Sequence, residues 1–325
     1  MKYETLPGLR LPVSKGVLGT MNFGDTVDER LAGQMLDASL EAGVTMLDTA
    51  NAYSAGTCEE MVGRLMRGHE DHLLVATKVG IPHGDADGLP PLSPRAITNC
   101  MDGSLRRLGV EKVDIYYLHA PDRETPVKET IETMKSLHEQ GKFDAWAFSN
   151  YSAWQSLELI QSADEIGLPR PVLGQQLYNT VSRKLESEYI EFSMFYGLHL
   201  MVYNPLVGGL LSGKHRFDSL PSKGRFGDSK LAEMYKKRYW SEDLFSAINA
   251  LQKVADNLET SLPELAFRWL HSKKSVGSIL LGASKFEQIQ ANLKACSAEP
   301  LDQESLLACD EIGATLSGPM ANYNR

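Results

Sequence analysis

The fold is decided by three short stretches, Leu47-Asp48-Thr49-Ala50-Asn51-Ala52-Tyr53, Leu74-Val75-Ala76-Thr77-Lys78 and Tyr116-Tyr117-Leu118-His119. Each starts as an apolar or β-branched run of the kind that forms a buried strand, and polar residues stand at its end. Those polar residues are an acid, a phenol, an amine and an imidazole, namely Asp48, Tyr53, Lys78 and His119. If the strands lie side by side in a parallel sheet, their carboxyl ends meet in one pocket. The stretches therefore predict a single polar site that could build a proton donor.

Strand-like and helix-like segments alternate along the chain. Eight strands are expected at about 17–19, 45–48, 73–78, 113–118, 143–148, 172–177, 198–203 and 276–281. Between them apolar residues fall at helical spacing, as at Ile97, Met101, Leu105 and Leu108. Eight βα units favour an α/β fold of the (β/α)8 TIM barrel type, and the alternative is an open doubly wound sheet. The open sheet is disfavoured because no GxGxxG motif follows a strand.

Several local signals add detail to this barrel. Residues 3–13 are expected to form an N-terminal β-hairpin that plugs the amino-terminal end of the barrel. Thr125 before Pro126 is expected to cap a helix, and Ser152 with Gln155 has the spacing of a capping box. Because no linker-like or low-complexity segment divides the chain, we expect a single domain over residues 1–325.

Composition limits the classes of function. Of 325 residues, 42% are hydrophobic and 23% are charged, as in an ordinary folded protein. The net charge of −9 makes nucleic acid or a membrane surface an unexpected partner. Without a long apolar run or a secretory signal at the amino terminus, the expected compartment is the cytoplasm. The four cysteines are scattered without metal-binding spacing, so we expect reduced thiols, no disulfide framework and no metal site.

A long segment after the seventh expected strand interrupts the alternation of strands and helices. About 35 residues from Asn204 to Tyr239 precede the next expected helix, which is long for a βα loop and indicates a functional lid or clamp. The segment from Lys214 to Arg238 contains eight basic and three acidic residues, a net charge of +5, which leaves a net charge of −14 for the rest of the chain. A basic loop suits a phosphorylated or carboxylated ligand, and a solvated face is the alternative explanation.

The same loop contains Gly208-Gly209-Leu210-Leu211-Ser212-Gly213-Lys214, which matches the GxxxxGK part of a phosphate loop. His215 stands where a kinase or NTPase needs a serine or threonine for magnesium, so such an activity is not expected. Glycines still let backbone N–H groups approach phosphate closely, and Lys214 adds positive charge. A pyrophosphate that carries no catalytic metal fits this loop.

The four polar residues can be given chemical roles. A phenol with a reference pKa near 10 donates a proton poorly at neutral pH unless its anion is stabilised. We expect Lys78 to lower the pKa of Tyr53, Asp48 to keep Lys78 charged, and His119 to orient a substrate oxygen as a neutral donor. Such a site protonates an oxygen that becomes alkoxide when hydride adds to a carbonyl, and a nicotinamide cofactor would supply the hydride.

Each of these residues also has a purely structural explanation. Asp48 could cap a helix, Tyr53 could pack in a half-buried position, Lys78 could extend its amine to solvent, and His119 could be a core histidine. Taken singly, the structural explanation is favoured for each. Their common position just after three consecutive strands favours catalysis, because a barrel gathers those strand ends into one site.

The order Asp48, Tyr53, Lys78, His119 resembles the catalytic tetrad of the aldo-keto reductases, which are NADPH-dependent (β/α)8 barrel enzymes. Further matching stretches are Gly19-Thr20-Met21, Phe148-Ser149-Asn150, Gln175-Gln176-Leu177-Tyr178-Asn179, Tyr203-Asn204-Pro205-Leu206 and Gly282-Ala283-Ser284-Lys285-Phe286-Glu287-Gln288, continuing to Asn292. The resemblance covers nearly the whole chain. Within the family, the run His119-Ala120-Pro121-Asp122 and the ending Asn322-Tyr323-Asn324-Arg325 look most like the aflatoxin aldehyde reductases.

The resemblance implies a role for each matching residue. Tyr53 would donate the proton, with Lys78, Asp48 and His119 in the supporting roles given above. The nicotinamide would be held by Ser149, Asn150, Gln175 and Tyr203, with Gly19, Thr20, Met21 and Gly282 beside the cofactor. The pyrophosphate would be covered by Asn204, Pro205, Leu206, Gly208, Gly209, Leu210, Ser212 and Lys214. The adenosine 2′-phosphate and adenine would meet Ser284, Lys285, Gln288 and Asn292, and a substrate carboxylate would meet Arg225 and Arg325.

We therefore expect NADPH-dependent reduction of aldehydes or ketones, with dicarbonyls and carboxylate-bearing semialdehydes as candidate substrates. Many family members carry arginine where Gln288 stands, so a preference for NADPH over NADH would rest mainly on Lys285 and Ser284. The alternative function is a cofactor-binding regulatory module resembling the potassium-channel β-subunits, which share the barrel. A homodimer stays open beside a monomer, since the sequence does not fix the oligomeric state.

Overall fold

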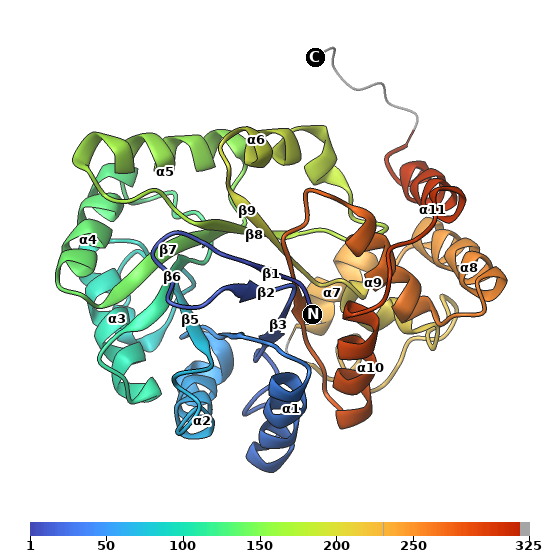
Figure 1. Ribbon diagram of the computed structural model, residues 1–325, viewed down its shortest axis with the longest axis horizontal. Helices are drawn as coiled ribbons and strands as arrows, with labels where there is room; N and C mark the ends of the chain where they lie inside the picture. The colour runs from blue at the N-terminus through green and yellow to red at the C-terminus, as the bar shows by residue number, and fades with distance from the viewer. Residues whose placement is uncertain (230, 319–325) are drawn as a thin grey trace.

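Eight parallel strands close into a barrel in the computed structural model, which describes residues 1–229 and 231–318 (Figure 1). In chain order the strands are β3 (Gly16–Gly19), β4 (Met46–Asp48), β5 (Leu74–Val79), β6 (Val113–Leu118), β7 (Phe143–Ser149), β8 (Leu173–Leu177), β9 (His199–Tyr203) and β10 (Ser278–Leu281). Each pairs in parallel with its neighbours, and β10 closes the ring by pairing with both β9 and β3. The predicted (β/α)8 barrel is confirmed, and the open doubly wound sheet is wrong.

Helices surround the barrel on the outside (Figure 1). They are α1 (Glu29–Glu41), α2 (Thr57–Leu65), α3 (Pro94–Leu108), α4 (Val127–Glu139), α5 (Ala153–Ile166), α6 (Tyr189–Phe195), α7 (Ala232–Tyr239), α8 (Glu242–Asn257), α9 (Leu262–Ser272), α10 (Phe286–Cys296) and α11 (Gln303–Thr315). Short 3-10 turns are η1 (Tyr53–Gly56), η2 (Gly84–Ala86), η3 (Lys184–Ser187) and η4 (Val207–Ser212). In the described part of the chain, every helix is too short or too polar to cross a membrane.

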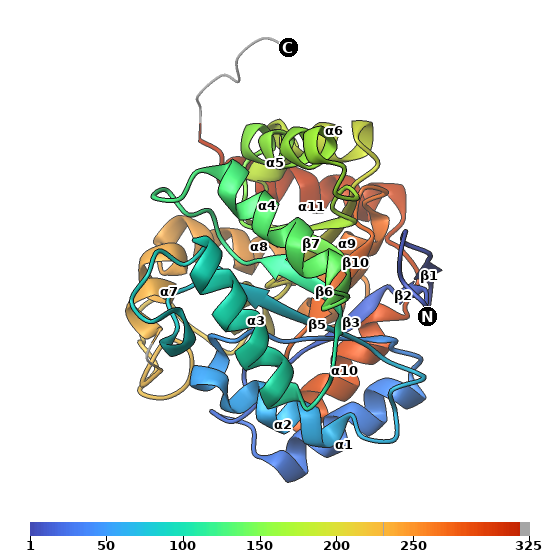
Figure 2. The same cartoon turned by 90° about the vertical axis from the view of Figure 1, so that its left-hand side faces the viewer.

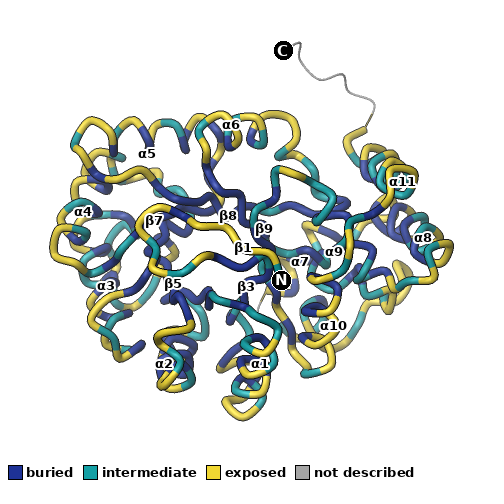
Figure 3. Tube along the Cα trace, viewed as in Figure 1, coloured by how far each residue is buried: buried dark blue, intermediate teal, exposed yellow. Residues whose placement is uncertain are grey.

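Two apolar cores hold these layers together. One lies between the strands and the helices, and it appears in Figure 3 as the dark blue inner faces of helices whose outer faces are yellow. The other fills the barrel interior with inward-facing side chains such as Met46, Ala76, Ile115 and Tyr117. Alternate strand residues face opposite sides, so both cores can be filled by the same strands.

The N-terminal hairpin forms as predicted. Strands β1 (Tyr3–Glu4) and β2 (Val13–Ser14) pair antiparallel, and between them Leu6 packs into the inner core together with Val13. In Figure 2 the hairpin lies at one end of the barrel and α7 at the other. The hairpin thus covers the amino-terminal end, which leaves the carboxyl ends of the strands for the polar residues.

Helix boundaries follow the local signals with one correction. Ser152 and Gln155 form the predicted capping box at the start of α5. Thr125 is not the N-cap of α4, because that position is taken by Pro126 and the helix begins at Val127. The Thr125 hydroxyl donates instead to Asp122 Oδ2, 2.8 Å away, so it stabilises the loop before the helix.

Candidate active site

The two-residue period of the strands brings the predicted residues into the barrel mouth. Met46, Ala76 and Tyr117 face the inner core. Two positions further along their strands stand Asp48, Lys78 and His119, which therefore point to the same side. Ser149, Gln175 and Tyr203 follow the inner-core residues Ala147, Leu173 and Met201 in the same way. The strand pattern thus collects six predicted residues around one opening.

Lys78 and Asp48 form an ion pair that is fully enclosed. The Lys78 ammonium donates to Asp48 Oδ1, and both side chains have 0% of their surface exposed. The ammonium also donates to the Thr49 carbonyl at 2.7 Å. Gln175 Nε2 donates to the other carboxylate oxygen of Asp48 at 2.8 Å. A buried charge pair needs such extra hydrogen bonds to offset its desolvation, and here each partner has one.

Tyr53 lies beside this pair. The Lys78 Nζ atom is 5.2 Å from the centroid of the Tyr53 ring. The rings of Tyr53 and His119 meet edge to face, with centroids 5.8 Å apart and planes at 79°. The acid, amine, phenol and imidazole that the sequence predicted to share a site are therefore close neighbours in space.

The turn that carries Tyr53 is conformationally strained. Directly after it, Ser54 (φ 48°) and Ala55 (φ 52°) adopt left-handed backbone, followed by Gly56 (φ 96°). Left-handed non-glycine residues each cost on the order of 1–3 kcal/mol and persist where surrounding contacts impose them. The Ser54 hydroxyl supplies one such contact by donating to the Phe23 carbonyl at 3.1 Å.

Burial controls the protonation of the site. Burial, followed by the nearby Asp48 carboxylate, raises the pKa of Tyr53 well above its usual range. Burial, followed by the Lys78 ammonium, lowers the pKa of His119 well below its usual range. Burial also lowers the pKa of Lys78, against the opposing effect of Asp48. The pKa of Tyr53 is therefore raised where a lowering was expected, because burial and the Asp48 carboxylate both disfavour the phenolate.

Asn150 organises the next part of the mouth. Its side-chain N–H group donates to the His119 carbonyl at 2.9 Å and to Ser149 Oγ at 3.1 Å. Tyr203 donates its hydroxyl to Asn150 Oδ1 at 2.7 Å. His119 Nδ1 is buried and has no hydrogen-bond partner among the described residues. An imidazole nitrogen without a partner is a group that a bound ligand or water could satisfy.

The loop after β9 is built on η4. Asn204 (φ 60°), Val207 (φ 55°), Gly208 (φ 67°) and Gly209 (φ 104°) all have left-handed backbone. Asn204 holds this turn, because its Oδ1 accepts from the Gly208 amide at 2.6 Å and its Nδ2 donates to the Tyr239 hydroxyl at 2.7 Å. Because Val207 is β-branched, its left-handed conformation is a true outlier.

The remaining predicted residues of this loop divide by exposure. Pro205 and Leu210 are buried, Leu206 and Ser212 are half-buried, and Lys214 is exposed. The helix expected after residue 239 is α8, which begins at Glu242, and an additional helix that was not expected, α7, occupies Ala232–Tyr239. Its sequence is highly charged, and Tyr235 and Tyr239 anchor it by lying buried. The segment expected to be a loop of about 35 residues is thus partly helical.

The turn after β10 presents the residues predicted for the adenosine end. Gly282, Ser284, Lys285 and Gln288 are exposed there, at or just before the start of α10. Gln288 Oε1 accepts from the Ser284 amide at 2.9 Å and from the Ser284 hydroxyl at 3.2 Å. Buried Asn292 donates to the Gly282 carbonyl at 3.2 Å. The start of an α-helix offers free N–H groups that suit an anion, and Lys285 adds a cation.

Asn22, which sequence reasoning missed, joins three loops. Its Nδ2 donates to the Ala283 carbonyl at 2.8 Å, and its Oδ1 accepts from Arg225 Nη2 at 3.3 Å. The Arg225 guanidinium also lies 5.1 Å from the centroid of the Tyr235 ring. The position of Asn22 in the turn after the first barrel strand was the only available signal.

The other predicted residues lie at the base of the mouth or beyond the described part. Gly19 ends β3 beside Asp48, and Thr20 donates its hydroxyl to the Asp48 carbonyl at 3.0 Å. Met21 follows and is half-buried. Arg325 lies outside the described residues.

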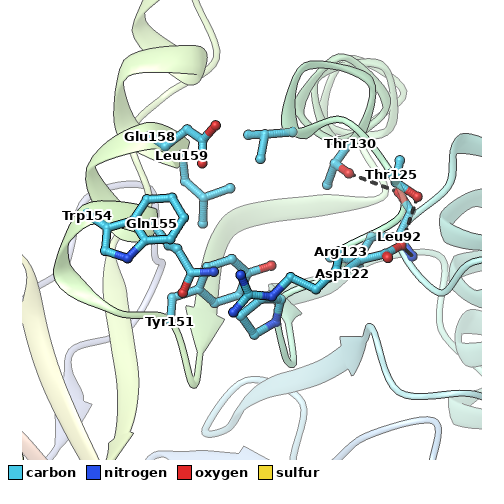
Figure 4. A pocket seen from close by; sticks show the side chains of 12 residues that line it. Leu92, Asp122, Arg123, Thr125, Thr130, Tyr151, Trp154, Gln155, Glu158 and Leu159 are labelled. Carbon is cyan, nitrogen blue, oxygen red and sulfur yellow. Dashed lines mark hydrogen bonds between the residues drawn. The ribbon is translucent and has the colours of Figure 1, made fainter.

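A cavity of about 160 Å³ opens beside this site, between the starts of α4 and α5 (Figure 4). Figure 4 shows Trp154 and Glu158 of α5 on one side of it and Thr130 of α4 across from them. Arg123, which follows β6, also lines it. None of Asp48, Tyr53, Lys78 and His119 lines this cavity, so it is separate from the four residues predicted to be catalytic.

Fold and site together define a (β/α)8 barrel whose strand ends carry a buried lysine, aspartate and histidine, with a half-buried tyrosine in the turn after β4. A sequence model of the aldo/keto reductase family matches residues 17–314. The chain belongs to the aldo/keto reductase family, and family membership makes it an oxidoreductase.

Individual relatives agree with this family. Human aflatoxin B1 aldehyde reductase member 2 is 34% identical, over 97% of this chain and 90% of its own length. Human aldo-keto reductase family 7 member A3 is 33% identical, over 95% of this chain and 96% of its own. A probable voltage-gated potassium channel subunit beta from Oryza sativa subsp. japonica is 35% identical, over 93% of each chain.

Proposed function

We propose that this protein reduces aldehydes and ketones to alcohols with NADPH, and that Tyr53 donates the proton. The observation that carries this proposal is the packing of Tyr53 against the enclosed Lys78–Asp48 pair and the His119 ring. Bound NADPH supplies the hydride in such chemistry. The similarity to aldehyde reductases supports the same reaction class.

The side chains divide the work of proton transfer. Tyr53 is protonated at physiological pH, as its reference pKa near 10 already ensures, and burial raises that pKa further, so its phenolate needs stabilisation during proton transfer. His119, kept neutral because burial lowers its pKa, can donate a hydrogen bond to the substrate oxygen without carrying charge. When Tyr53 gives up its proton, the ammonium of Lys78 stabilises the phenolate that forms.

The residues around the mouth fit a nicotinamide dinucleotide. Asn150 and Gln175 present amide groups beside the tetrad, as a carboxamide requires. The left-handed glycines of η4 bring backbone close to the surface without side chains, as a pyrophosphate requires. Lys285 at the start of α10 would hold a 2′-phosphate, with Ser284 beside it.

Cofactor choice can be tested at Lys285. NADPH carries a 2′-phosphate that NADH lacks, so Lys285→Ala should weaken NADPH binding at least 10-fold and leave NADH binding nearly unchanged. Fluorescence titration with both cofactors measures this. Lys294→Ala, at the other end of α10, is the matched control. Equal losses for NADPH and NADH at position 285 would contradict the assignment.

For substrates, we propose that Arg225 and Arg325 favour carbonyl compounds that carry a carboxylate. Arg225 Nη2 makes one long hydrogen bond, 3.3 Å to Asn22, which leaves donors of its guanidinium for a ligand. Arg225→Gln should then raise KM for a semialdehyde several-fold more than KM for a neutral aldehyde. An equal rise for both would remove Arg225 from substrate recognition.

The proton donor is tested with Tyr53→Phe in an NADPH-consumption assay over a panel of aldehydes. Loss of a positioned general acid should lower kcat/KM by roughly 10²- to 10⁴-fold. Tyr116→Phe is the matched control, since Tyr116 lies on β6 but faces the outer core. Equal turnover by wild type and Tyr53→Phe would eliminate Tyr53 as the donor.

The similarity to a probable potassium channel subunit beta keeps a regulatory module as the second candidate. Such a module would bind NADPH tightly, turn over negligibly and copurify with a protein partner. Turnover of the aldehyde panel in the preceding assay decides between the two functions.

A further inference from the structure

Three side chains of metal-binding types converge outside the barrel mouth. His83 and Asp85 come from the turn at η2, and Cys100 comes from α3, which packs against that turn. One ligand atom from each, a ring nitrogen, a carboxylate oxygen and a thiol sulfur, lies within 4.8 Å of the others. Nitrogen, oxygen and sulfur donors of this kind are the ligands of Zn²⁺ and related transition metals. Cys100 is far from His83 and Asp85 in the sequence, so the spacing of the residues alone does not indicate a metal-binding motif.

A fourth polar group, Asn51, points into the same cluster without a partner. The side chain of Asn51 is completely buried, and neither its Oδ1 nor its Nδ2 makes a hydrogen bond of normal geometry with a described residue. It nevertheless lies close enough to the Cys100 thiol to affect it. A buried amide without partners is costly, so its placement against the thiol needs an explanation. The effect of Asn51 on Cys100 is that of its N–H group facing the thiol, so a half-turn of the amide about its Cβ–Cγ bond would offer the carbonyl oxygen as a further ligand to an ion bound by Cys100.

The charge around the cluster is incompletely balanced. Arg107 donates to Glu59 Oε2 at 2.7 Å and to Asp85 Oδ2 at 2.7 Å. One guanidinium thus serves two carboxylates, of which Glu59 is fully buried, and one negative charge is left over. A divalent ion together with the Cys100 thiolate would bring the buried group to neutrality. The thiol proton would be released to water as the sulfur–metal bond forms.

Geometry and access are compatible with an ion. Tetrahedral zinc with ligand distances of about 2.0–2.3 Å places its ligand atoms about 3.3–3.8 Å apart. His83 Nδ1 and Asp85 Oδ2 are already 3.3 Å apart, and any pair at the upper limit of 4.8 Å would need to approach by about 1 Å. Asp85 retains 20% of its side-chain surface and His83 retains 8%, so the η2 turn forms the entrance.

We propose that His83, Asp85 and Cys100, with Asn51 as fourth ligand, form a binding site for a transition metal of the Zn²⁺ class. The ion ties the η2 turn and α3 to the segment between Asp48 and Tyr53, because Asn51 belongs to that segment. The site is separate from the barrel mouth, and its existence does not depend on the proposed reductase activity.

Cobalt titration tests the site, because thiolate ligation of Co²⁺ gives an intense near-ultraviolet band that oxygen and nitrogen ligands alone do not. Wild-type protein should bind one equivalent of Co²⁺ with this band, and Zn²⁺ should displace it. Cys100→Ser should abolish the band and weaken Zn²⁺ binding at least 10-fold. The matched control is Cys296→Ser, another buried thiol, which should keep both.

A second variant keeps the test decisive if Cys100→Ser folds poorly. His83→Gln removes a ligand at the half-buried end of the site and should also weaken Zn²⁺ binding at least 10-fold. Zn²⁺ should raise the thermal midpoint of wild type and leave that of His83→Gln unchanged, because only a folded site binds. The proposal is overturned if wild type shows no thiolate band, if Cys100→Ser retains it, or if His83→Gln binds Zn²⁺ like wild type.

Discussion

Removing the charge of Lys78 should destabilise the protein far more than removing an exposed lysine. Lys78→Met leaves the Asp48 carboxylate fully buried with Gln175 as its side-chain donor, and it leaves the Thr49 carbonyl without the ammonium. Breaking a buried ion pair from one side costs about 3–5 kcal/mol of unfolding free energy. A loss of that size is a large part of the total stability of a typical protein.

Urea unfolding followed by far-ultraviolet circular dichroism measures the loss. The matched control is Lys112→Met, which removes a lysine that bonds Asp144 at 2.8 Å but keeps 53% of its side chain exposed. Exposed pairs contribute about 0–1 kcal/mol, so this variant should unfold nearly like wild type. A Lys78→Met variant no less stable than Lys112→Met would refute the claim that burial sets the cost.

The double variant separates pairing from packing. If the ion pair is responsible, Asp48→Asn combined with Lys78→Met should lose less than the two single losses added, by about 2–3 kcal/mol. Removing both charges leaves no unpaired charge in the core, although the shape of the site is still disturbed. Strict additivity would show that Lys78 and Asp48 act independently, against the contact seen between them.

Two further predictions concern stability. The folded protein keeps His119 neutral, whereas the unfolded chain takes up a proton near pH 6.5, so the free energy of unfolding should fall as pH falls. Between pH 7 and pH 5 wild type should lose about 2 kcal/mol more unfolding free energy than His119→Asn in urea titrations. Equal losses in the two proteins would contradict this. Gly63→Ala in α2 would place a Cβ 2.3 Å from the Leu108 carbonyl and should lower the free energy of unfolding by about 1–3 kcal/mol. Gly33→Ala in α1, whose Cβ would lie 3.5 Å from its nearest contact, should raise it by about 0.5–1 kcal/mol. Thermal midpoints that move in the same direction for both variants would contradict this prediction.

The barrel could be predicted because its strands are continuous apolar runs bounded by turn residues. Every barrel strand begins and ends within two residues of the expected range, for example β6 at Val113–Leu118 and β8 at Leu173–Leu177. Parallel strands buried on both faces must be apolar throughout, which makes them easy to find. The placement of Asp48, Lys78 and His119 followed from the same pattern, since strand ends in a barrel share one mouth.

The loop after β9 could not be read in the same way. Helix α7 carries Lys236, Lys237 and Arg238 and has no apolar face of ordinary width, so sequence periodicity gave no helix there. Its stability depends on tertiary contacts, such as the Tyr239 hydroxyl that accepts from Asn204. Asn22 was missed for a related reason: its two hydrogen bonds join loops that only the closed barrel brings together.

The largest departure from expectation concerns the sign of the effect on Tyr53, and it changes how the site must work. We expected the Lys78 ammonium to lower the pKa of Tyr53, but burial and the Asp48 carboxylate, which is paired with Lys78, both raise that pKa. A phenol is protonated at physiological pH even at its ordinary pKa near 10, and a raised pKa makes it a weaker acid, so the proposed donation depends on stabilising the phenolate as it forms. In the proposed reaction the Lys78 ammonium, 5.2 Å from the centroid of the Tyr53 ring, would stabilise the negative charge that the departing proton leaves on Tyr53. Preorganised charge of this kind lowers the barrier of a reaction that creates negative charge on Tyr53, as the proposed proton donation to a carbonyl oxygen would.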